Sequence, residues 1–345
     1  MRKLRKIRKV IIVPKAQGNN PSQIKPSISI KRRMPKSVQP VQNMSKPLAL
    51  PLLNCSNDFI NLYKTNKINY EALTESCTFV LKNTNKVNVS IIIPVMGREN
   101  FHQPLIDHLN IAINKFSTKT FSITIVEHTN NPKHEEKSNK NNINYIRINK
   151  KDQDPFNKCL CMNVGSLYSN DAEYYLFHDI DILMNENYFI DIFKNIERVN
   201  NNSALQTFAG KRIIVMDQYE TNSIIIHKKN LNTITPTYSD PGAPGGSIFV
   251  KAQDFKKVGG YDAEFFYGYS PEDAFFWHKL ELMTNIQGCN NPVIEAYHMW
   301  HPPSHASNPD KKSLASRWVK FQSLQQEEKI KFINHISNEF KKLYK

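Results

Sequence analysis

The chain has 345 residues, which is enough for one large domain or two small ones, and its composition of 40% hydrophobic and 22% charged residues allows an ordinary buried core. Its formal charge of +15 at pH 7 is unevenly placed, because residues 1–50 contain 13 Lys and Arg and no Asp or Glu. Removing these 13 charges leaves +2 for residues 51–345, so the globular body is almost neutral and the basicity belongs to a tail.

Residues 1–50 are predicted to form a disordered tail, because Pro, Ser, Gln and Asn accompany the basic residues. Contact with RNA, DNA or an anionic membrane, a targeting role, and a solvated extension without a binding role are all compatible with this composition. The apolar run at residues 10–13 is too short for a signal-peptide core or a membrane span, and no other apolar run is long enough. We therefore expect a soluble protein without a signal peptide or transmembrane segment.

The cysteines indicate a reducing compartment. Their number is odd and their spacing lacks the double pair typical of zinc sites. Cys159 and Cys161 fall in a predicted helix, where side chains two residues apart point in different directions. Reduced, buried thiols in the cytoplasm are the expected state. The five positions are Cys55, Cys77, Cys159, Cys161 and Cys289.

Residues 51–86 are predicted to be a helical lead-in, and an alternating pattern of strands and helices begins at residue 87. The β-branched and apolar runs predict strands at residues 89–95, 121–126, 143–148 and 174–177, with helices at 101–116 and 156–168. This βαβ rhythm is typical of a mainly parallel, doubly wound α/β sheet flanked by helices. The absence of a Gly-x-Gly-x-x-Gly or Walker-type loop after the first strand argues against dinucleotide and P-loop sites.

Polar residues follow several of the predicted strands, at the sheet edge where ligands bind. Residues 94–98 and Glu127 end the first two strands, and Asp179 and Asp181 end the strand at 174–177. Two carboxylates one residue apart after a buried strand are costly to bury unless a cation or hydrogen bonds compensate them. They indicate Mg²⁺ or Mn²⁺ bridging to a phosphate, while a turn in which Asp caps the backbone is the alternative.

The second half is predicted to contain strands at residues 212–216, 223–227, 247–251 and 293–297, a helix at 272–283, and amphipathic helices in residues 311–345. Gly245 and Gly246 permit a close backbone approach to a ligand. Three histidines at 298, 301 and 305 beside prolines suggest a rigid metal-binding loop, although a single histidine is more often structural. The aromatic residues Phe265, Phe266, Tyr267, Tyr269 and Trp277 are interpreted as a stacking platform for a sugar ring or base.

Several segments together resemble GT-A glycosyltransferases in their order and spacing. The similarity is greatest to the β-1,4-galactosyltransferase family and to the related C-terminal motif of polypeptide N-acetylgalactosaminyltransferases and chondroitin-type polymerases. It covers roughly residues 87–305, so residues 87–310 are assigned as the catalytic domain and 311–345 as C-terminal helices. The segments are Ile93-Pro94 with Arg98, FNKCLCMNVG at 156–165, FHDID at 177–181, Pro244-Gly245-Gly246, GGYD at 259–262, GYSPED at 268–273, and HMWH at 298–301.

The resemblance implies a metal-dependent transferase that moves a sugar of the galactose or N-acetylhexosamine type from a UDP-sugar to a hydroxyl of a glycan or glycoprotein. Mn²⁺ or Mg²⁺ would be held by Asp181 and His301, with His298 as a possible further ligand, and Asp179 would face the ribose or the surroundings of the metal. The remaining donor contacts implied are Pro94, Arg98 and Glu127 around the uridine, Phe156 in the donor site, Lys158 near the phosphates, and Gly246 against the donor sugar and the acceptor.

Asp273 matches the general base of inverting members, and Glu272 the residue that orients the acceptor. Ser270-Pro271 and Ala274 depart from the family pattern, so donor and acceptor identity stay open. A retaining transferase, a nucleic-acid-binding protein with an inactive transferase-like body, and a metal-dependent hydrolase of nucleotide sugars are the alternatives. An acceptor hydroxyl is a poor nucleophile and needs a base within hydrogen-bond reach, which favours the inverting reaction.

Overall fold

The computed structural model describes most of the chain after the N-terminal tail. The described residues are 55–82, 85–151, 154–169, 171–200, 212–234, 238–240, 245–268, 270–284, 294–302 and 310–344. The predictions made for the tail, Cys289, His305 and Tyr269 therefore fall outside the described residues.

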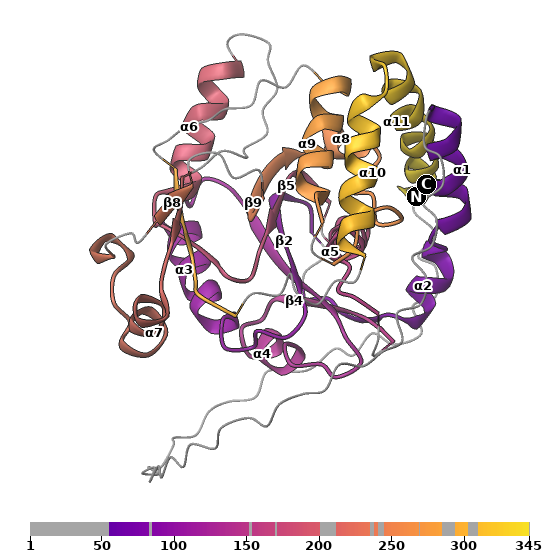
Figure 1. Ribbon diagram of the computed structural model, residues 1–345. Helices are drawn as coiled ribbons and strands as arrows, with labels where there is room; N and C mark the ends of the chain where they lie inside the picture. The colour runs from indigo at the N-terminus through magenta and orange to yellow at the C-terminus, as the bar shows by residue number, and fades with distance from the viewer. Residues whose placement is uncertain are drawn as a thin grey trace, which may run out of the picture.

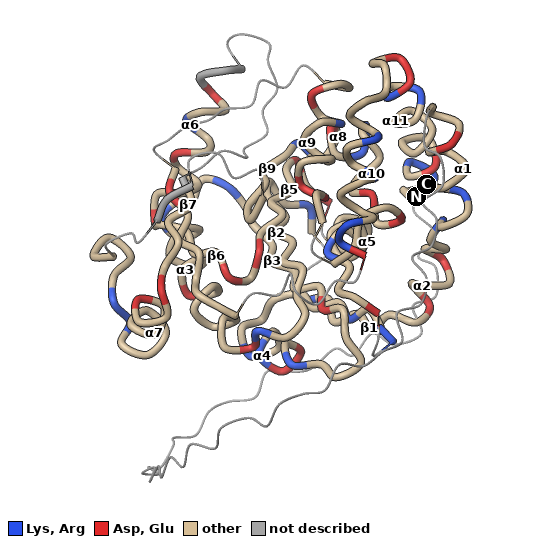
Figure 2. The backbone as a smooth tube through the Cα atoms, viewed as in Figure 1, with Lys and Arg blue, Asp and Glu red and all other residues tan. Residues whose placement is uncertain are grey.

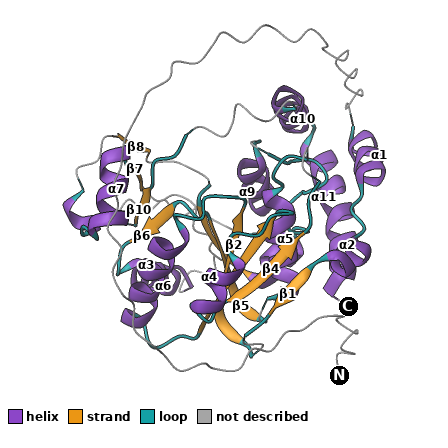
Figure 3. Ribbon diagram, turned by 90° about the horizontal axis from the view of Figure 1, so that it is seen from below, coloured by secondary structure: helices purple, strands orange, loops and turns teal. Residues whose placement is uncertain are grey.

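A six-stranded sheet forms the centre of the molecule, in the order β1-β4-β3-β2-β5-β9 (Figures 1 and 3). The four inner strands β4, β3, β2 and β5 are parallel, whereas β1 and β9 run antiparallel at the two edges. The predicted α/β class with a mainly parallel sheet is confirmed. The bounds are β1 Thr78–Val80, β2 Val87–Val95, β3 Phe121–His128, β4 Asn144–Ile148, β5 Ala172–His178 and β9 Ser247–Lys251.

Helices cover both faces of this sheet. Successive side chains of a strand point to opposite faces, so both faces of the inner strands are apolar and each is buried in its own hydrophobic cluster. On β5, Tyr175 and Phe177 belong to one cluster and Tyr174 and Leu176 to the other. The first cluster includes α1 Ser56–Asn66, α2 Tyr70–Ser76, α5 Lys158–Tyr168, α8 Ala252–Lys257, α9 Glu272–Met283, α10 Lys311–Ser323 and α11 Gln326–Lys341. The second includes α3 His102–Lys115 and α6 Tyr188–Asn200. The structure also contains the short helices α4 Glu135–Lys140, η1 Leu231–Thr233 and η3 Lys342–Tyr344.

A smaller four-stranded sheet lies beside the main one, in the order β6-β10-β7-β8. Its strands are β6 Ile182–Met184, β10 Glu295–His298, β7 Arg212–Val215 and β8 Tyr238–Asp240. Because β6 follows β5 after only three residues, the bend at Asp179–Asp181 joins the two sheets.

The strand predicted at residues 223–227 is wrong, since this segment is the end of helix α7 Gln218–His227. The Asp217 carboxylate accepts a hydrogen bond from the Glu220 amide, and the Glu220 carboxylate accepts one from the Asp217 amide, which forms a capping box. This start signal outweighs the β-propensity of the three consecutive isoleucines.

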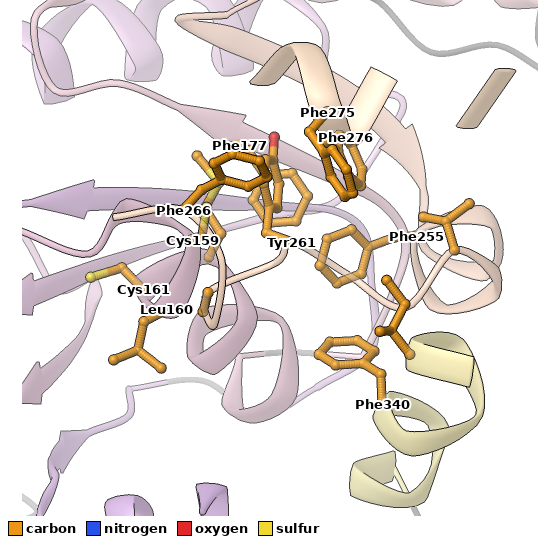
Figure 4. Close-up of a cluster of buried hydrophobic side chains, with 14 of the residues drawn as sticks. Cys159, Leu160, Cys161, Phe177, Phe255, Tyr261, Phe266, Phe275, Phe276 and Phe340 are labelled. Atoms are coloured by element: carbon orange, nitrogen blue, oxygen red, sulfur yellow. The ribbon is translucent and has the colours of Figure 1, made fainter. Parts of the chain in front are cut away.

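The predicted aromatic platform is also wrong for the residues at its centre. Phe265 and Phe266 are each 2% exposed and Trp277 is 9% exposed, so they are core residues. Figure 4 shows Phe266 with Phe275, Phe276 and Tyr261 in the same buried cluster. Their large apolar area is removed from water inside the fold rather than offered to a ligand.

The lead-in and C-terminal helices pack on each other at one side of the molecule (Figure 1). The Phe59 ring lies 5.6 Å from that of Phe332, and Lys67 forms a 2.6 Å ion pair with Glu339. Charged residues of both signs are interspersed over the described body, as its small net charge implies (Figure 2). Within the described ranges, each helix is too short or too polar to cross a bilayer.

Candidate active site

The candidate site lies at the point where the sheet's winding reverses. After β4 the chain returns to the opposite side of β2 and forms β5, so β2 and β5 are adjacent parallel strands whose connections run in opposite directions. Crevices for ligands form beyond the carboxyl ends of such strands. Here β2 leads into Gly97 and Arg98, and β5 leads into Asp179 and Asp181.

Asp181 is the centre of a cluster that can hold a metal. His301 Nε2 lies 3.1 Å and His298 Nε2 3.9 Å from Asp181 Oδ2, and potential ligand atoms of the three residues all lie within 4.8 Å of one another. The loop after β10 is fixed there by a 2.8 Å hydrogen bond from the Met299 amide to the Asp181 carbonyl. The three predicted metal ligands are therefore neighbours, although 117 residues separate Asp181 from His298 in the sequence.

Arg98 supplies a positive charge to the same carboxylate. Its guanidinium forms an ion pair with Asp181 Oδ2, and its NH2 atom lies 3.4 Å from His301 Nδ1. Arg98 adopts a left-handed backbone conformation with φ of 58°, directly after Gly97 with φ of 66°. A non-glycine residue there is strained, which is common where a side chain must be aimed at a site.

The electrostatics of the cluster favour an anionic Asp181. Burial alone would raise the pKa of Asp181, but the hydrogen bond from His301 and the charges of Arg98 and His298 hold it well below the usual range. The same hydrogen bond raises the pKa of His301, whereas burial lowers the pKa of His298. The carboxylate is therefore ready to bind a cation, which would replace the positive groups around it.

One carboxylate and two imidazoles suit a divalent transition-metal cation. Mg²⁺ prefers an all-oxygen shell, whereas Mn²⁺ also accepts imidazole nitrogen. The residues present therefore fit Mn²⁺ better than Mg²⁺.

A second cluster surrounds the Lys158 ammonium at the N-terminus of α5. Lys158 Nζ lies 3.0 Å from Asp179 Oδ1, 3.1 Å from Asp273 Oδ2 and 3.9 Å from Glu272 Oε1. Glu272 and Asp273 open helix α9, where carboxylates also favour the helix dipole. Burial raises the pKa of Asp179 to about 6 and that of Glu272 to about 7, so Glu272 is able to exchange a proton near neutral pH.

Glycines let the backbone before β9 approach both clusters. The Gly246 carbonyl accepts a 2.8 Å hydrogen bond from the Asp179 amide, and its φ of 81° is one that glycine adopts without strain. A Cβ at Gly245 would lie only 3.0 Å from Asp273 Cγ and closer still to Oδ2. The sequence indicated a close approach here but not that its partner is Asp273.

Glu127 and Phe156 accept hydrogen bonds from other residues of the protein in this conformation. Glu127 is fully buried and accepts hydrogen bonds from the Tyr145 hydroxyl and from the amides of Lys133 and His134. The Phe156 carbonyl accepts a hydrogen bond of 2.5 Å from the Gly268 amide. Pro94 lies buried within β2 instead of ending it. Their predicted contacts with a nucleotide stay predictions.

A histidine pair that the sequence pattern did not predict lies behind the Gly97–Arg98 loop. His134 Nε2 lies 2.8 Å from the Gly97 carbonyl, and its Nδ1 lies 2.9 Å from His102 Nδ1. Burial lowers the pKa values of both imidazoles, which favours their neutral forms, and one hydrogen bond joins the two Nδ1 atoms. Isolated histidines in a polar loop and at a helix start gave no signal of this contact.

The sequence matches no protein-family model and no curated protein. Among solved structures, it is similar to the β1,4-galactosyltransferase 7 of Drosophila in complex with manganese, UDP-Gal and xylobiose, with 16% identity, a TM-score of 0.38, and coverage of 68% of this chain and 79% of that one. TarS of S. aureus in complex with UDP-GlcNAc gives 16% identity, a TM-score of 0.42, and coverage of 73% and 72%. GalNAc-T7 with UDP, GalNAc and Mn²⁺ gives 12% identity, a TM-score of 0.47, and coverage of 75% of this chain and 55% of that one. All three TM-scores are below 0.5, so function has to be inferred from the residues of the site itself.

Proposed function

We propose that the protein is a metal-dependent glycosyltransferase that moves a sugar from a UDP-sugar to a hydroxyl of a glycan or glycoprotein. One observation carries this proposal: a cluster of side chains that can hold a metal and a carboxylate pair meet at the switch point of a mainly parallel sheet. The bend at residues 179–181 belongs to both, since Asp181 lies in the first cluster and Asp179 in the second.

The first cluster suits the leaving group of such a reaction. Asp181, His298 and His301 would hold Mn²⁺, which stabilises the negative charge that develops on the departing diphosphate. Arg98 neutralises Asp181, and its guanidinium would be free to contact the diphosphate if a metal took over that carboxylate.

The second cluster suits the attacking group. Asp273 is the candidate for the base that accepts the proton of an acceptor hydroxyl, since Lys158 holds its carboxylate at the site and its side chain is 15% exposed. Glu272, with a pKa raised by burial to about 7, is the partner that orients the acceptor. A base that activates the acceptor directly implies inversion at the anomeric carbon.

The test is release of UDP from a panel of UDP-sugars with Mn²⁺, with and without glycan acceptors. UDP-Gal and UDP-GlcNAc, which are bound in two of the similar structures, are the first donors to try. Transfer that is abolished by Asp273→Asn, with donor binding retained, is the expected result. Release of UDP at the same rate without any acceptor would indicate a hydrolase instead.

The configuration of the product separates the inverting from the retaining reaction. NMR of the newly formed anomeric centre is expected to show inversion. A product that keeps the donor's configuration, or an active Asp273→Asn variant, would remove Asp273 from the role of base.

A further inference from the structure

Lys158 joins the two halves of the site through a single ammonium group. It contacts Asp179 at the end of β5 and Asp273 at the start of α9, at 3.0 and 3.1 Å, and Glu272 lies 3.9 Å away. Its side chain is only 12% exposed, and the side chains of Glu272 and Asp273 are 12% and 15% exposed. These are charge-assisted contacts largely shielded from water, where they are stronger than surface ion pairs.

The three carboxylates around Lys158 depend on its charge. Like charges that are close together in a desolvated site cannot all stay ionised without a cation. The other titratable groups that interact with Asp273 here are Tyr261 and Cys159, both neutral since burial holds their pKa values well above the usual range. Within the described part of the chain, Lys158 is therefore the cation that contacts Asp273.

The contact also constrains the Asp273 carboxylate. Oδ2 is held by Lys158 on one side and approached closely by the Gly245 backbone on the other. Oδ1 is buried and accepts no hydrogen bond from a described residue. A carboxylate anchored through one oxygen keeps a fixed orientation, which favours proton removal from a bound hydroxyl.

We propose that Lys158 is a positioning residue that anchors Asp273 through Oδ2 and thereby fixes the orientation of its carboxylate for proton removal from the acceptor hydroxyl, in place of the phosphate contact implied by the resemblance. This inference rests on the proposed function, because it names the group that prepares the proposed base. It also predicts that Lys158 serves the acceptor half of the reaction more than the binding of the donor.

The kinetic test compares Lys158→Met with Lys158→Arg, which keeps the charge, and with Lys140→Met, which removes an exposed lysine far from the site in sequence. Lys158→Met is expected to lower kcat by about 10²-fold while the Kd for UDP with Mn²⁺ changes less than about threefold. Lys158→Arg should recover part of kcat, and Lys140→Met should behave as wild type. A UDP affinity that falls tenfold or more in Lys158→Met would overturn the proposal and restore the phosphate role.

A second test does not depend on turnover. Lys158→Met leaves Asp273 without its cation, so its Tm should fall by about 5 °C or more at pH 7.5, and adding Asp273→Asn should recover much of this loss. Additive Tm changes in the double variant would show that the two residues are not coupled and would overturn the proposal. If the wild type transfers no sugar, the proposed function fails, whereas the coupling of Lys158 to Asp273 is still decided by this measurement.

Discussion

Replacement of Gly245 by alanine tests the packing of the proposed base most severely. The new Cβ would lie 3.0 Å from Asp273 Cγ and still closer to Oδ2, whereas carbon atoms pack at about 3.5–4.0 Å. Either the carboxylate or the backbone at 245 must therefore move by roughly 1 Å. The carboxylate resists this shift, because Lys158 holds Oδ2 at 3.1 Å.

A displacement of this size predicts two measurable losses. Misplacement of a catalytic group by about 1 Å costs about 10²-fold in rate, and overpacking of a filled site costs about 1–3 kcal/mol of stability. The assay is kcat for sugar transfer together with urea unfolding of the same variant. In an Asp273→Asn background, which has already lost the base, Gly245→Ala should have little further effect on the residual rate.

Backbone strain does not confound this test, because Gly245 is not among the described glycines with a positive φ. A Gly245→Ala variant with wild-type kcat would refute the close contact between this backbone and Asp273. An equal loss of rate on Gly245→Ala in the wild type and in the Asp273→Asn background would also refute this contact.

Three further predictions concern charge. Lys279 is fully buried with Asp262 at 2.5 Å, so Lys279→Met should lower the free energy of unfolding by about 3–5 kcal/mol in urea titrations, and a loss below about 1 kcal/mol would contradict the role of this pair. Burial raises the pKa of Glu264 from 4.5 to about 7, so ionisation of this carboxyl opposes folding. The contribution of the protonated carboxyl to the free energy of unfolding is fully present below pH 4.5 and is lost as the pH rises through 7. Glu264→Gln should accordingly be more stable than wild type at pH 8, by up to about 3 kcal/mol, with no gain at pH 4.5 in the same titrations. Arg98 neutralises Asp181 and so competes with a metal ion for this carboxylate. The Arg98→Met variant should therefore bind Mn²⁺ about tenfold more tightly than wild type in calorimetry without nucleotide. Weaker binding would show that Arg98 supports the metal site instead of competing with it.

The sequence predicted the central sheet well because its strands are buried on both faces and read as continuous apolar runs. The run at residues 89–95 became β2 and that at 174–177 became the middle of β5. The acidic pair after β5 could be placed at the ligand edge by the same reasoning. The direction of β9 was not accessible, because it depends on which edge of the sheet the returning chain joins.

The wrong structural predictions arose where local sequence signals and tertiary packing favour different outcomes. Residues 223–227 have strand propensity, but the capping box at Asp217 and Glu220 starts a helix that runs through them. Phe265 and Phe266 stand in a segment rich in glycine and acid that suggests a ligand loop, yet they pack against α1, α9 and α11. Which aromatic residues remain exposed is decided by helices far away in the sequence.

The site itself was predictable as a set of residues but not as two clusters. Asp181, His298 and His301 were expected together, and they are neighbours. The carboxylates that surround Lys158 come from two further elements, and only the fold brings α5 and α9 together at the end of β5. The buried histidines behind Gly97 had no sequence signal, since their partners are a backbone carbonyl and each other.

Equilibrium binding of Mn²⁺ in the presence of UDP tests the central claim most directly. Electron paramagnetic resonance of free Mn²⁺ counts the ions bound by the wild type and by Asp181→Asn, which keeps the shape of the side chain and removes its charge. The account predicts one tightly bound ion per wild-type chain and binding weakened by about 10²-fold or more in the variant. Equal affinity in the two proteins would contradict the assignment of Asp181, and with it the metal-assisted transfer proposed for this site.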